Sequence, residues 1–343
     1  MKQGKSLVDL ATELERQSET KKDYIADTRK LYMTPNGDIE IQMQDPFTVT
    51  PTTHAHKQLA TWANIPQKYY DLCPAELRAV NVNHWLRNEP GQRMIRTLDG
   101  KARAFLSNRY RCLDNFDLAE AVLPVLQEVP EMQVISCDLT ETRMYIKALF
   151  PRITGDLGKG DMVQSGVVIS NSEIGHGSLK VEPLVYRLVC LNGMISGYSQ
   201  KRYHVGRASN TEGDASEIFR DETLQADDKA FWMKVQDTVR ASVDQIKFDK
   251  IVDHMKETKA NKIEQDPVEV VEKVQKKYSL TDTERGGILR HLVEGGDMSQ
   301  FGLVNAVTRT SQDLEQYDRA TEFERLGGQI VELPKASWQA LAA

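Results

Sequence analysis

Cysteine and long apolar runs are both scarce in this chain of 343 residues, and each shortage excludes a class of protein. The four cysteines, at positions 73, 112, 137 and 190, are too widely spaced for a zinc site and too few for a disulfide framework. No stretch approaches the roughly 20 apolar residues of a membrane-spanning helix. The charged N-terminal segment also lacks the apolar core of a secretory signal. We therefore expect a cytoplasmic protein with reduced thiols and no membrane contact.

Short motifs for nucleotide or hydrolase chemistry are also missing. The glycine-rich segment 155–161 lacks the spacing of a phosphate-binding P-loop, and no hydroxyl residue follows its lysine to hold magnesium. Ser178 follows Gly175-His176-Gly177 without the G-x-S-x-G elbow of a hydrolase, and His176 is too close in sequence to act freely as its base. The sequence therefore predicts no ATPase, and a glycine-flanked turn is the simpler interpretation of His176.

Metal ligands at a recognisable spacing are missing as well. His54 and His56 are two positions apart, whereas two ligands on one helix need a spacing of three or four. We therefore expect no cofactor, no metal and no catalytic residue that the sequence can name. One alternative stays open, namely an enzyme assembled from residues distant in sequence, such as a nuclease that uses Asp161 and Glu173.

Hydrophobic periodicity divides the chain into three parts, of which the first covers residues 1–50. An amphipathic helix is predicted over 6–18, where leucines recur at spacings of three and four. A β-hairpin is predicted over 30–43, because its turn contains Asn36-Gly37, which supplies the positive φ angles of a tight turn. This part is therefore expected to be a helix followed by a hairpin.

The second part, residues 51–213, predicts a core of strands with a few helices. A helix is expected over 54–63 with Thr52 or Thr53 as its cap, and others over 67–72 and 117–126. Segments rich in β-branched and aromatic residues predict strands. These segments are 94–98, 102–106, 133–138, 143–150, 162–170 and 179–189. Short turns join them, so we expect an antiparallel, meander-like sheet with flanking helices.

The third part, residues 214–343, predicts helices only. Neither glycine nor proline occurs between Gly213 and Pro267, which predicts one long helix of about 35–45 residues or two helices with a soft break. Further helices are predicted over 267–278, 281–294 and 299–326. The fold class predicted for the whole chain is α+β, with a long helix and a helical C-terminal region after the sheet.

The ends of these last helices carry their own signals. Thr281 and Glu284 match a capping box, in which the threonine hydroxyl and the glutamate carboxylate bond each other's backbone amides. Gly327-Gly328 is expected to end the last helix, because glycine is the residue that most often follows a helix C-terminus.

Positive charge is concentrated in the middle of a chain whose net charge is −6. The segment 87–111 holds seven basic and two acidic residues, and the segment 180–207 holds five basic residues and one acidic residue. Residues 208–343 are strongly acidic, with eighteen basic and twenty-six acidic residues. A basic groove can bind a polyanion even on an acidic protein, because the nearby charges set the field that a ligand meets.

Aromatic residues are interleaved with these cations, a pattern typical of sites for single-stranded nucleic acid. Such sites combine Lys and Arg side chains along the phosphates with rings on which bases stack. In an extended chain, Arg109-Tyr110-Arg111 presents two guanidinium groups on one face and a ring on the other. The same pattern would arise if the rings filled the core and the cations were only solvated. The predicted contacts are Arg103, Arg109, Tyr110, Arg111, Arg187, Lys201, Arg202, Tyr203 and Arg207.

Seven short motifs lie in order along the chain. They are Ile65-Pro66-x-Lys68-Tyr69-Tyr70, Asn81-x-Asn83, Arg103-Ala104-Phe105-Leu106-Ser107-x-Arg109-Tyr110-Arg111-x-x-Asp114-Asn115, Gly160-Asp161, Asn171-Ser172-Glu173-x-Gly175, Tyr186-Arg187-x-x-Cys190-x-Asn192-Gly193 and Asn305-Ala306-Val307-Thr308. Together they resemble the phage/plasmid-like family known as domain of unknown function 932. The resemblance covers residues 50–310 and implies a protein carried by phages, prophages or conjugative plasmids. It implies no mechanism, because the family has no assigned activity.

The predicted order of elements, a meander followed by a long helix, is similar to that of single-strand annealing proteins, which form rings or filaments along a basic groove. This similarity implies single-stranded DNA as the partner and a homo-oligomer as the assembly. We therefore expect single-stranded DNA binding that supports annealing or recombination for a phage or plasmid, without nucleotide hydrolysis. The alternative is a mobile-element factor for host takeover or defence evasion, which binds a host or plasmid protein through its C-terminal helices and does not bind DNA.

Overall fold

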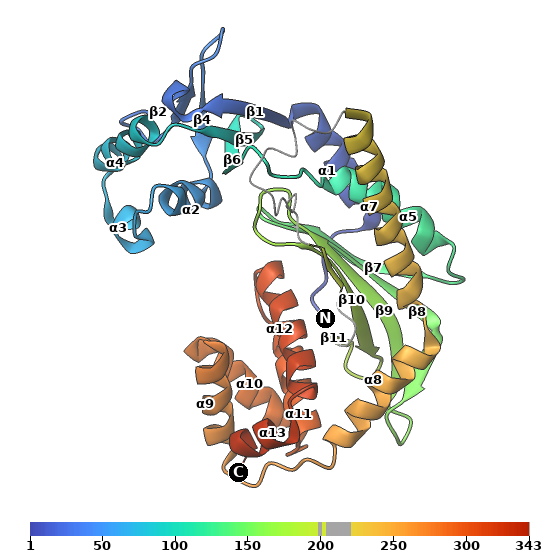
Figure 1. Cartoon of the computed structure of the whole chain (residues 1–343). Coiled ribbons are helices and arrows are strands. Elements are labelled where there is room, and N and C mark those ends of the chain that lie inside the picture. Colours follow the sequence, from blue (N-terminus) through green and yellow to red (C-terminus); the bar gives the residue numbers. More distant parts are fainter. Residues whose placement is uncertain (198–200, 204–220, 343) are drawn as a thin grey trace.

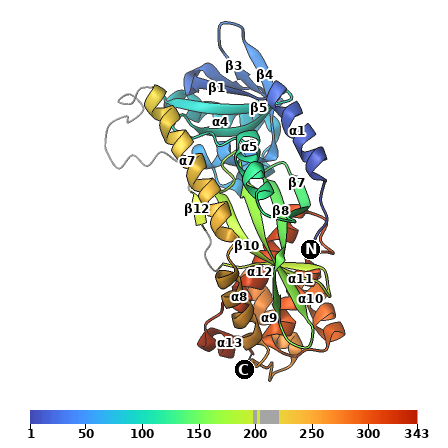
Figure 2. The same ribbon diagram turned by 90° about the vertical axis from the view of Figure 1, so that its right-hand side faces the viewer.

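The protein has the α+β fold class that the sequence predicts. The computed structural model describes residues 1–197, 201–203 and 221–342. An N-terminal module, a central sheet and a helical C-terminal region follow one another along the long axis of the molecule (Figure 1, Figure 2). Within the described ranges, no helix is long and apolar enough to cross a membrane.

The N-terminal module is a six-stranded sheet with three α-helices and one 3-10 helix, and its strand order is β1-β5-β6-β4-β3-β2. Its strands are β1 (Lys22–Asp27), β2 (Leu31–Met33), β3 (Ile39–Ile41), β4 (Phe47–Pro51), β5 (Gln92–Leu98) and β6 (Lys101–Ser107). Its helices are η1 (Thr28–Lys30, a 3-10 turn), α2 (Thr53–Trp62), α3 (Gln67–Leu72) and α4 (Ala75–Asn88). The predicted hairpin is β2–β3, with Gly37 at φ 92° in its turn. Thr52 caps α2 by accepting a hydrogen bond from the Ala55 amide, as predicted.

Helix α4 is one of the elements of this module that periodicity does not predict, together with strands β1 and β4. Ala79, Val82 and Leu86 are buried on one side of it, but Leu77 and Val80 are 44% and 65% exposed on the other. Apolar residues on both sides blur the single stripe by which an amphipathic helix is identified. The helix forms because its buried side packs against β2 and η1.

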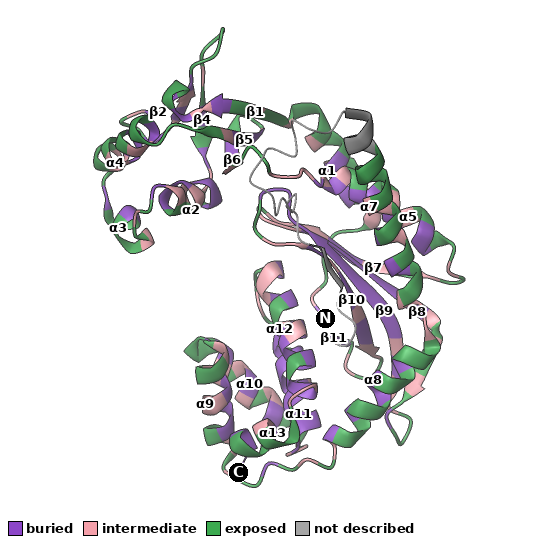
Figure 3. Cartoon of the chain, viewed as in Figure 1, coloured by how far each residue is buried: buried purple, intermediate pink, exposed green. Residues whose placement is uncertain are grey.

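The central sheet is an antiparallel meander in the strand order β11-β10-β9-β8-β7, with a further strand, β12, paired to β10. The sequence predicts one such sheet, but its first two expected strands, 94–98 and 102–106, form β5 and β6 of the N-terminal module instead. The strands of the central sheet are β7 (Gln133–Leu139), β8 (Met144–Asp156), β9 (Met162–Asn171), β10 (Leu179–Arg187), β11 (Asn192–Ile195) and β12 (Lys201–Tyr203). Residues 144–150 of β8 and 165–171 of β9 are buried without interruption, which is typical of strands covered on both faces. Figure 3 shows this burial along the middle of the sheet.

Three helices cover one face of the central sheet: α1 (Leu7–Thr20), α5 (Asn115–Gln127) and α7 (Asp221–Ser242). Ile146 and Ala148 of β8 reach this face and share one apolar cluster with Val235 and Val239 of α7. Because side chains alternate between the two faces of a strand, Lys147 and its neighbours point to the opposite face. That face packs against the C-terminal region.

Two buried ion pairs join this opposite face to α12 (Tyr317–Val331). The Lys147 ammonium donates to Glu324 across 2.6 Å, and both side chains are 0% exposed. Arg325 donates through Nε and Nη2 to the Glu182 carboxylate at 2.9 and 2.6 Å, and Glu182 is also 0% exposed. Burial lowers the pKa of Lys147, and the Glu324 carboxylate opposes that shift. The C-terminal region is therefore docked by charge as well as by apolar contact.

The C-terminal region contains seven helices among the described residues. They are α7, α8 (Gln245–Thr258), α9 (Pro267–Tyr278), α10 (Asp282–Gly295), α11 (Gln300–Thr310), α12 and α13 (Lys335–Ala342). The sequence leaves open whether the segment after Gly213 forms one long helix or two, and the structure has two helices, α7 and α8. Asp244 lies between them and caps α8, since its carboxylate accepts a hydrogen bond from the Lys247 amide. The predicted capping box of Thr281 and Glu284 is confirmed at the start of α10.

The prediction of one helix over 299–326, ending at Gly327-Gly328, is wrong. The segment forms α11 and α12, and both glycines lie inside α12. Their role is close packing, because a Cβ atom at Gly328 would collide with the Ile195 carbonyl oxygen, and one at Gly327 with the Thr308 side chain. Glycine here lets a helix approach β11 and α11, at the cost of a lower helix propensity.

The Lys147–Glu324 pair gives a first testable prediction. In Lys147→Met the Glu324 carboxylate stays buried without its cation, so the free energy of unfolding should fall by about 3–5 kcal/mol. Urea unfolding followed by circular dichroism measures this. The double variant K147M/E324L should recover most of the loss. Arg152→Ala is the control, since Arg152 and Glu131 form a pair that is 62% and 59% exposed and is worth about 1 kcal/mol at most. An effect of K147M no larger than that of R152A would contradict the prediction.

Candidate functional site

The central sheet has two ends that matter for function, and we name them by their connections. At the loop end, residues 172–178 connect β9 to β10. At the turn end, residues 188–191 connect β10 to β11. Since a strand rises about 3.3 Å per residue, the nine residues of β10 separate the two ends by about 26 Å.

The first basic segment lies against the loop end. Arg103 of β6 donates through Nη1 to the Glu173 carboxylate at 3.1 Å. The Tyr110 hydroxyl donates to the Ser172 carbonyl oxygen and accepts from the Gly175 amide, both at 3.2 Å. Gly175 has φ 74°, a conformation that favours glycine, and a Cβ atom there would press on Leu106. The N-terminal module is thus attached to the sheet through this loop.

A group of buried charges, which we call the Glu173 cluster, makes this attachment. It consists of Lys21, Arg96, Arg103, Asp114 and Glu173. Arg96 is 2% exposed and donates to Asp23 at 2.8 Å, to Asp114 at 2.6 Å and to the Glu173 carbonyl oxygen at 2.8 Å. Glu173 also accepts from the Asn115 amide at 2.7 Å. Counted with Asp23, the cluster has three cations and three carboxylates, so its charges cancel.

Asp114 shows how tightly the cluster is coupled. Burial alone would raise the pKa of this carboxyl, but the Arg96 guanidinium and the Lys21 ammonium outweigh burial, and the pKa is lowered. Asp114 therefore stays ionised and keeps both cations paired. Arg96 and Arg103, counted among the basic residues of the sequence, are held largely by partners within the protein.

The three residues Arg109, Tyr110 and Arg111 differ in how far their side chains are exposed. Arg109 is exposed. Tyr110 is half-buried, and burial raises the pKa of its hydroxyl to about 12. Arg111 is 16% exposed, pairs with Asp227 at 3.2 Å and Asp228 at 2.5 Å, and lies 4.7 Å over the Phe231 ring. Of these three side chains, Arg109 is therefore the most accessible from solvent.

The second basic segment is divided between the two ends of the sheet. Strand β12 pairs antiparallel with Leu179–Val181, at the start of β10, and so lies at the loop end. The side chains of Lys201, Arg202 and Tyr203 lie outside the described part of the structure, as does Arg207 altogether. Arg187 lies at the turn end, about 26 Å away. The structure thus brings β12 near Arg103 and Arg109–Arg111, and separates Arg187 from them.

A cleft of about 490 Å³ opens beside Arg103, where α2 begins. Lys101, Thr52 and Thr53 line it together with Arg103, and Glu141 and Asp99 lie at its edge. Asp99 is occupied by Arg16, which donates to both of its oxygens at 2.9 and 3.0 Å. The cleft therefore offers hydroxyl groups and two cationic side chains next to the loop end.

The profile of one family, Domain of unknown function (DUF932), matches residues 104–326. The chain belongs to the DUF932 family. The matched region runs from β6 through the central sheet into α12, and leaves most of the N-terminal module outside. No curated protein and no solved structure matches the chain.

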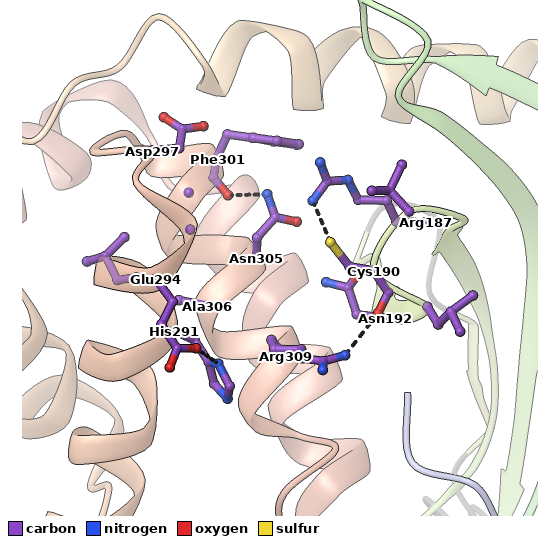
Figure 4. A pocket seen from close by; sticks show the side chains of 15 residues that line it. Arg187, Cys190, Asn192, His291, Glu294, Asp297, Phe301, Asn305, Ala306 and Arg309 are labelled. Carbon is purple, nitrogen blue, oxygen red and sulfur yellow. Dashed lines mark hydrogen bonds and ion pairs between the residues drawn. The ribbon is translucent and has the colours of Figure 1, made fainter.

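Three of the seven motifs that resemble the family, far apart in sequence, meet at the turn end of the sheet. Asp161 accepts from Nε and Nη2 of Arg187 at 2.7 and 2.8 Å. The Asn192 amide nitrogen donates to the Thr308 hydroxyl at 2.6 Å. These contacts join three of the seven motifs around a cavity of about 550 Å³, which we call the turn pocket (Figure 4). The sequence marked Asn192 and Asn305 as family motif residues, but gave no chemical reason to place them at a site.

The alternative of a nuclease using Asp161 and Glu173 does not fit this arrangement. Asp161 precedes β9 and Glu173 follows it, so the ten residues of this strand keep the two carboxylates about 30 Å apart. Both are also paired to arginine, Asp161 to Arg187 and Glu173 to Arg103. They cannot bind one metal ion together.

The Glu173 cluster gives a second prediction, on stability and pH. Asp114→Asn should lower the free energy of unfolding by about 3 kcal/mol at pH 7, because Arg96 and Lys21 lose a buried carboxylate. The folded-state pKa of Asp114 lies below its ordinary value of 3.8. Its stabilisation is therefore present above that pH and is lost as the pH falls through the folded-state pKa.

The measurement is urea unfolding of wild type and D114N at several pH values. The difference in the free energy of unfolding between wild type and D114N should be constant near neutral pH and should become smaller below about pH 4. Asp99→Asn is the control, because Asp99 and its partner Arg16 are 43% and 45% exposed, and such a pair is worth about 1 kcal/mol at most. If D114N lowers the free energy of unfolding by as little as D99N does, the Glu173 cluster does not attach the N-terminal module to the central sheet.

Proposed function

We propose that this protein binds single-stranded DNA at the loop end of the central sheet. In this proposal it supports annealing or recombination for a phage or plasmid, without hydrolysing a nucleotide. The observation that carries the proposal is the meeting of the two basic segments. Arg103 and Tyr110 contact the loop 172–178, and β12, with Lys201 and Arg202, pairs with the strand that leaves the same loop. Cations from distant parts of a chain, gathered at one edge, are what a phosphate backbone needs.

The predicted contact residues have different roles in this proposal. Phosphate contacts are assigned to Arg109 and to Lys201 and Arg202, with Lys57 of α2 and Lys101 as exposed neighbours. Arg103 is paired with Glu173 and fixes the loop end, whereas Arg111 is paired with Asp227 and Asp228 of α7. Tyr203 is assigned to base stacking, whereas Tyr110 orients the loop through its hydroxyl. Arg187, at the far end of β10, is left out of the DNA contact.

A second candidate function is a factor that binds a host or plasmid protein. It is favoured by four exposed apolar side chains on the consecutive helices α3 and α4, since exposed apolar surface marks interaction sites. They are Tyr69, Leu72, Leu77 and Val80, which are 48%, 78%, 44% and 65% exposed. DNA binding separates the two candidates, because the second requires none.

The first test is fluorescence anisotropy of a labelled single-stranded oligonucleotide over a salt series. Binding through several phosphates should weaken steeply with salt, and Arg109→Ala should reduce the log–log slope by about one. Arg152→Ala, which removes an exposed cation near the other end of β8, should leave the slope unchanged. Absence of binding at low salt would refute the proposal, and equal slopes for R109A and wild type would move the site elsewhere.

The pairing of Arg111 with α7 gives a further prediction. Asp227 and Asp228 are 70% and 54% exposed, so they compete with phosphate for the Arg111 guanidinium. In D227N/D228N this guanidinium is released, and the affinity for single-stranded DNA should rise about three-fold with a steeper salt dependence. The control D253N/E257Q removes the same charge from exposed positions of α8. An equal gain in both variants would show an effect of net charge alone.

A further inference from the structure

Helices α1 and α5 leave an apolar groove between them, on the face of the central sheet opposite to α12. Figure 2 shows α5 between α1 and α7 over this face. The groove has a volume of about 390 Å³, and apolar side chains of both helices line it, among them Ala11, Leu14, Phe116, Ala119 and Leu123. Because Ala11 and Ala119 have short side chains, they do not fill the space between the helices. We call this feature the α1–α5 groove.

The apolar side chains of the groove are in part open to solvent. Phe116 and Leu123 are only partly buried against the apolar cluster beneath the helices. Val8 lies three residues before Ala11 and therefore on the same side of α1, and it is 74% exposed. Exposed apolar side chains beside a groove are typical of a surface that another polypeptide covers.

The two helices run antiparallel along the groove. Lys21, the C-cap of α1, donates to Asp114, the N-cap of α5, at 2.6 Å. The C-terminal end of α1 therefore lies beside the N-terminal end of α5. Val8 begins the other end of the groove, and Leu123, in the second half of α5, belongs to that same end.

Four carboxylates belong to the end of the groove where α1 stops and α5 starts. Glu120 lines the groove, and Asp117 lies three residues before it on α5. Glu15 and Glu19 follow Ala11 by one and two turns of α1. Across the part of the chain that the structure describes, none of these four carboxylates has an ion-pair or hydrogen-bond partner. Burial raises the pKa of Asp117, and nearby carboxylates, Glu120 among them, add to the rise.

The cations near this end lie elsewhere or already have partners. Arg16 lies on the far side of α1 from the groove, where it pairs with Glu13 at 2.8 Å. The pKa of Glu13 is lowered to about 2 by its bonds to Arg16 and further by the charge of Lys5. Lys21 opposes the rise in the pKa of Asp117, but it is held in the Glu173 cluster. Helix α5 itself contains no basic residue.

A helix fits this groove better than an extended chain does. Two helices present side chains and no free backbone groups along their length, so an extended strand would find no partners there for its own amide and carbonyl groups. A helix bonds its own backbone and can lay one stripe of side chains between two others. Val8 and Glu15 are seven residues apart, which is about two turns, or about 10 Å. A matching stripe therefore has apolar side chains and, two turns further on, positive charge.

We propose that the α1–α5 groove binds an amphipathic helix of a partner protein. Apolar side chains of that helix lie against Val8 and Leu123, and its lysine or arginine side chains lie against Glu15 and Glu120. Charge complementarity selects this partner, because the four carboxylates repel an acidic helix and attract a basic one. The proposal goes beyond DNA binding and does not depend on it, since neither α1 nor α5 carries a residue assigned to a DNA contact.

The test is fluorescence anisotropy of a labelled helical peptide titrated with the full chain. The peptide has an alanine background, with two leucines on one face and two lysines placed two turns further along the same face. One control peptide has glutamates in place of the lysines, and another has the lysines on the opposite face. We expect the first peptide to bind at least about tenfold more tightly than either control.

Two variants connect this binding to the groove. Ala11→Trp fills the groove from an exposed position and should weaken the binding of the lysine peptide at least about tenfold. E15Q/E120Q removes two carboxylates with little change in volume and should weaken it about fivefold. D253N/E257Q, the matched loss of charge on α8, should have no effect. Circular dichroism and urea unfolding check that each variant is folded.

Three results would overturn the proposal. They are no binding of the lysine peptide up to about 1 mM, equal affinity for either control peptide, and binding to A11W or E15Q/E120Q as tight as to D253N/E257Q. Sedimentation velocity examines a different occupant. Self-association of the chain that A11W abolishes would also overturn the proposal, and would assign the groove to a second copy of the chain.

Discussion

The buried ion pairs Lys147–Glu324 and Glu182–Arg325 set the position of the C-terminal region, and the turn end of the sheet depends on them. A charge removed from water is tolerated only where an opposite charge and further hydrogen bonds meet it. If α12 moved along the sheet by one helical turn, the four charges of these pairs would be buried without partners. The pairs therefore fix one position of α12 on the central sheet. In that position Gly328 meets β11, and α11 comes close enough to the turn 188–191 to enclose a pocket.

Buried charges also need partners at the loop end, where they attach the N-terminal module to the central sheet. There, Arg96 and Arg103 are paired with Asp114 and Glu173, and they attach the N-terminal module to the loop 172–178. A high count of basic residues in a segment therefore overstates the positive charge that a ligand meets. The paired arginines give the loop end its shape, whereas Arg109 is exposed to solvent.

Sequence analysis succeeded where neighbouring residues decide the structure. The hairpin turn at Gly37, the cap at Thr52 and the capping box of Thr281 and Glu284 are local, and each formed as predicted. It failed at α4 and at Gly327-Gly328, because both depend on what the helix packs against. Glycine usually ends a helix, but in α12 it removes a Cβ atom that would strike the Ile195 carbonyl oxygen.

By itself, the sequence determined the α+β class, many of the helices and strands, the two basic segments and the resemblance to the DUF932 family. These follow from short-range periodicity, composition and ordered motifs. Only the tertiary structure decided which basic residues are accessible and which share an end of the sheet. Arg103 finds its partner seventy residues along the chain, and the length of β10 carries Arg187 to the opposite end from β12. The basic segments of the sequence thus became two separate regions, because ion pairing and strand length act between residues that are distant in sequence.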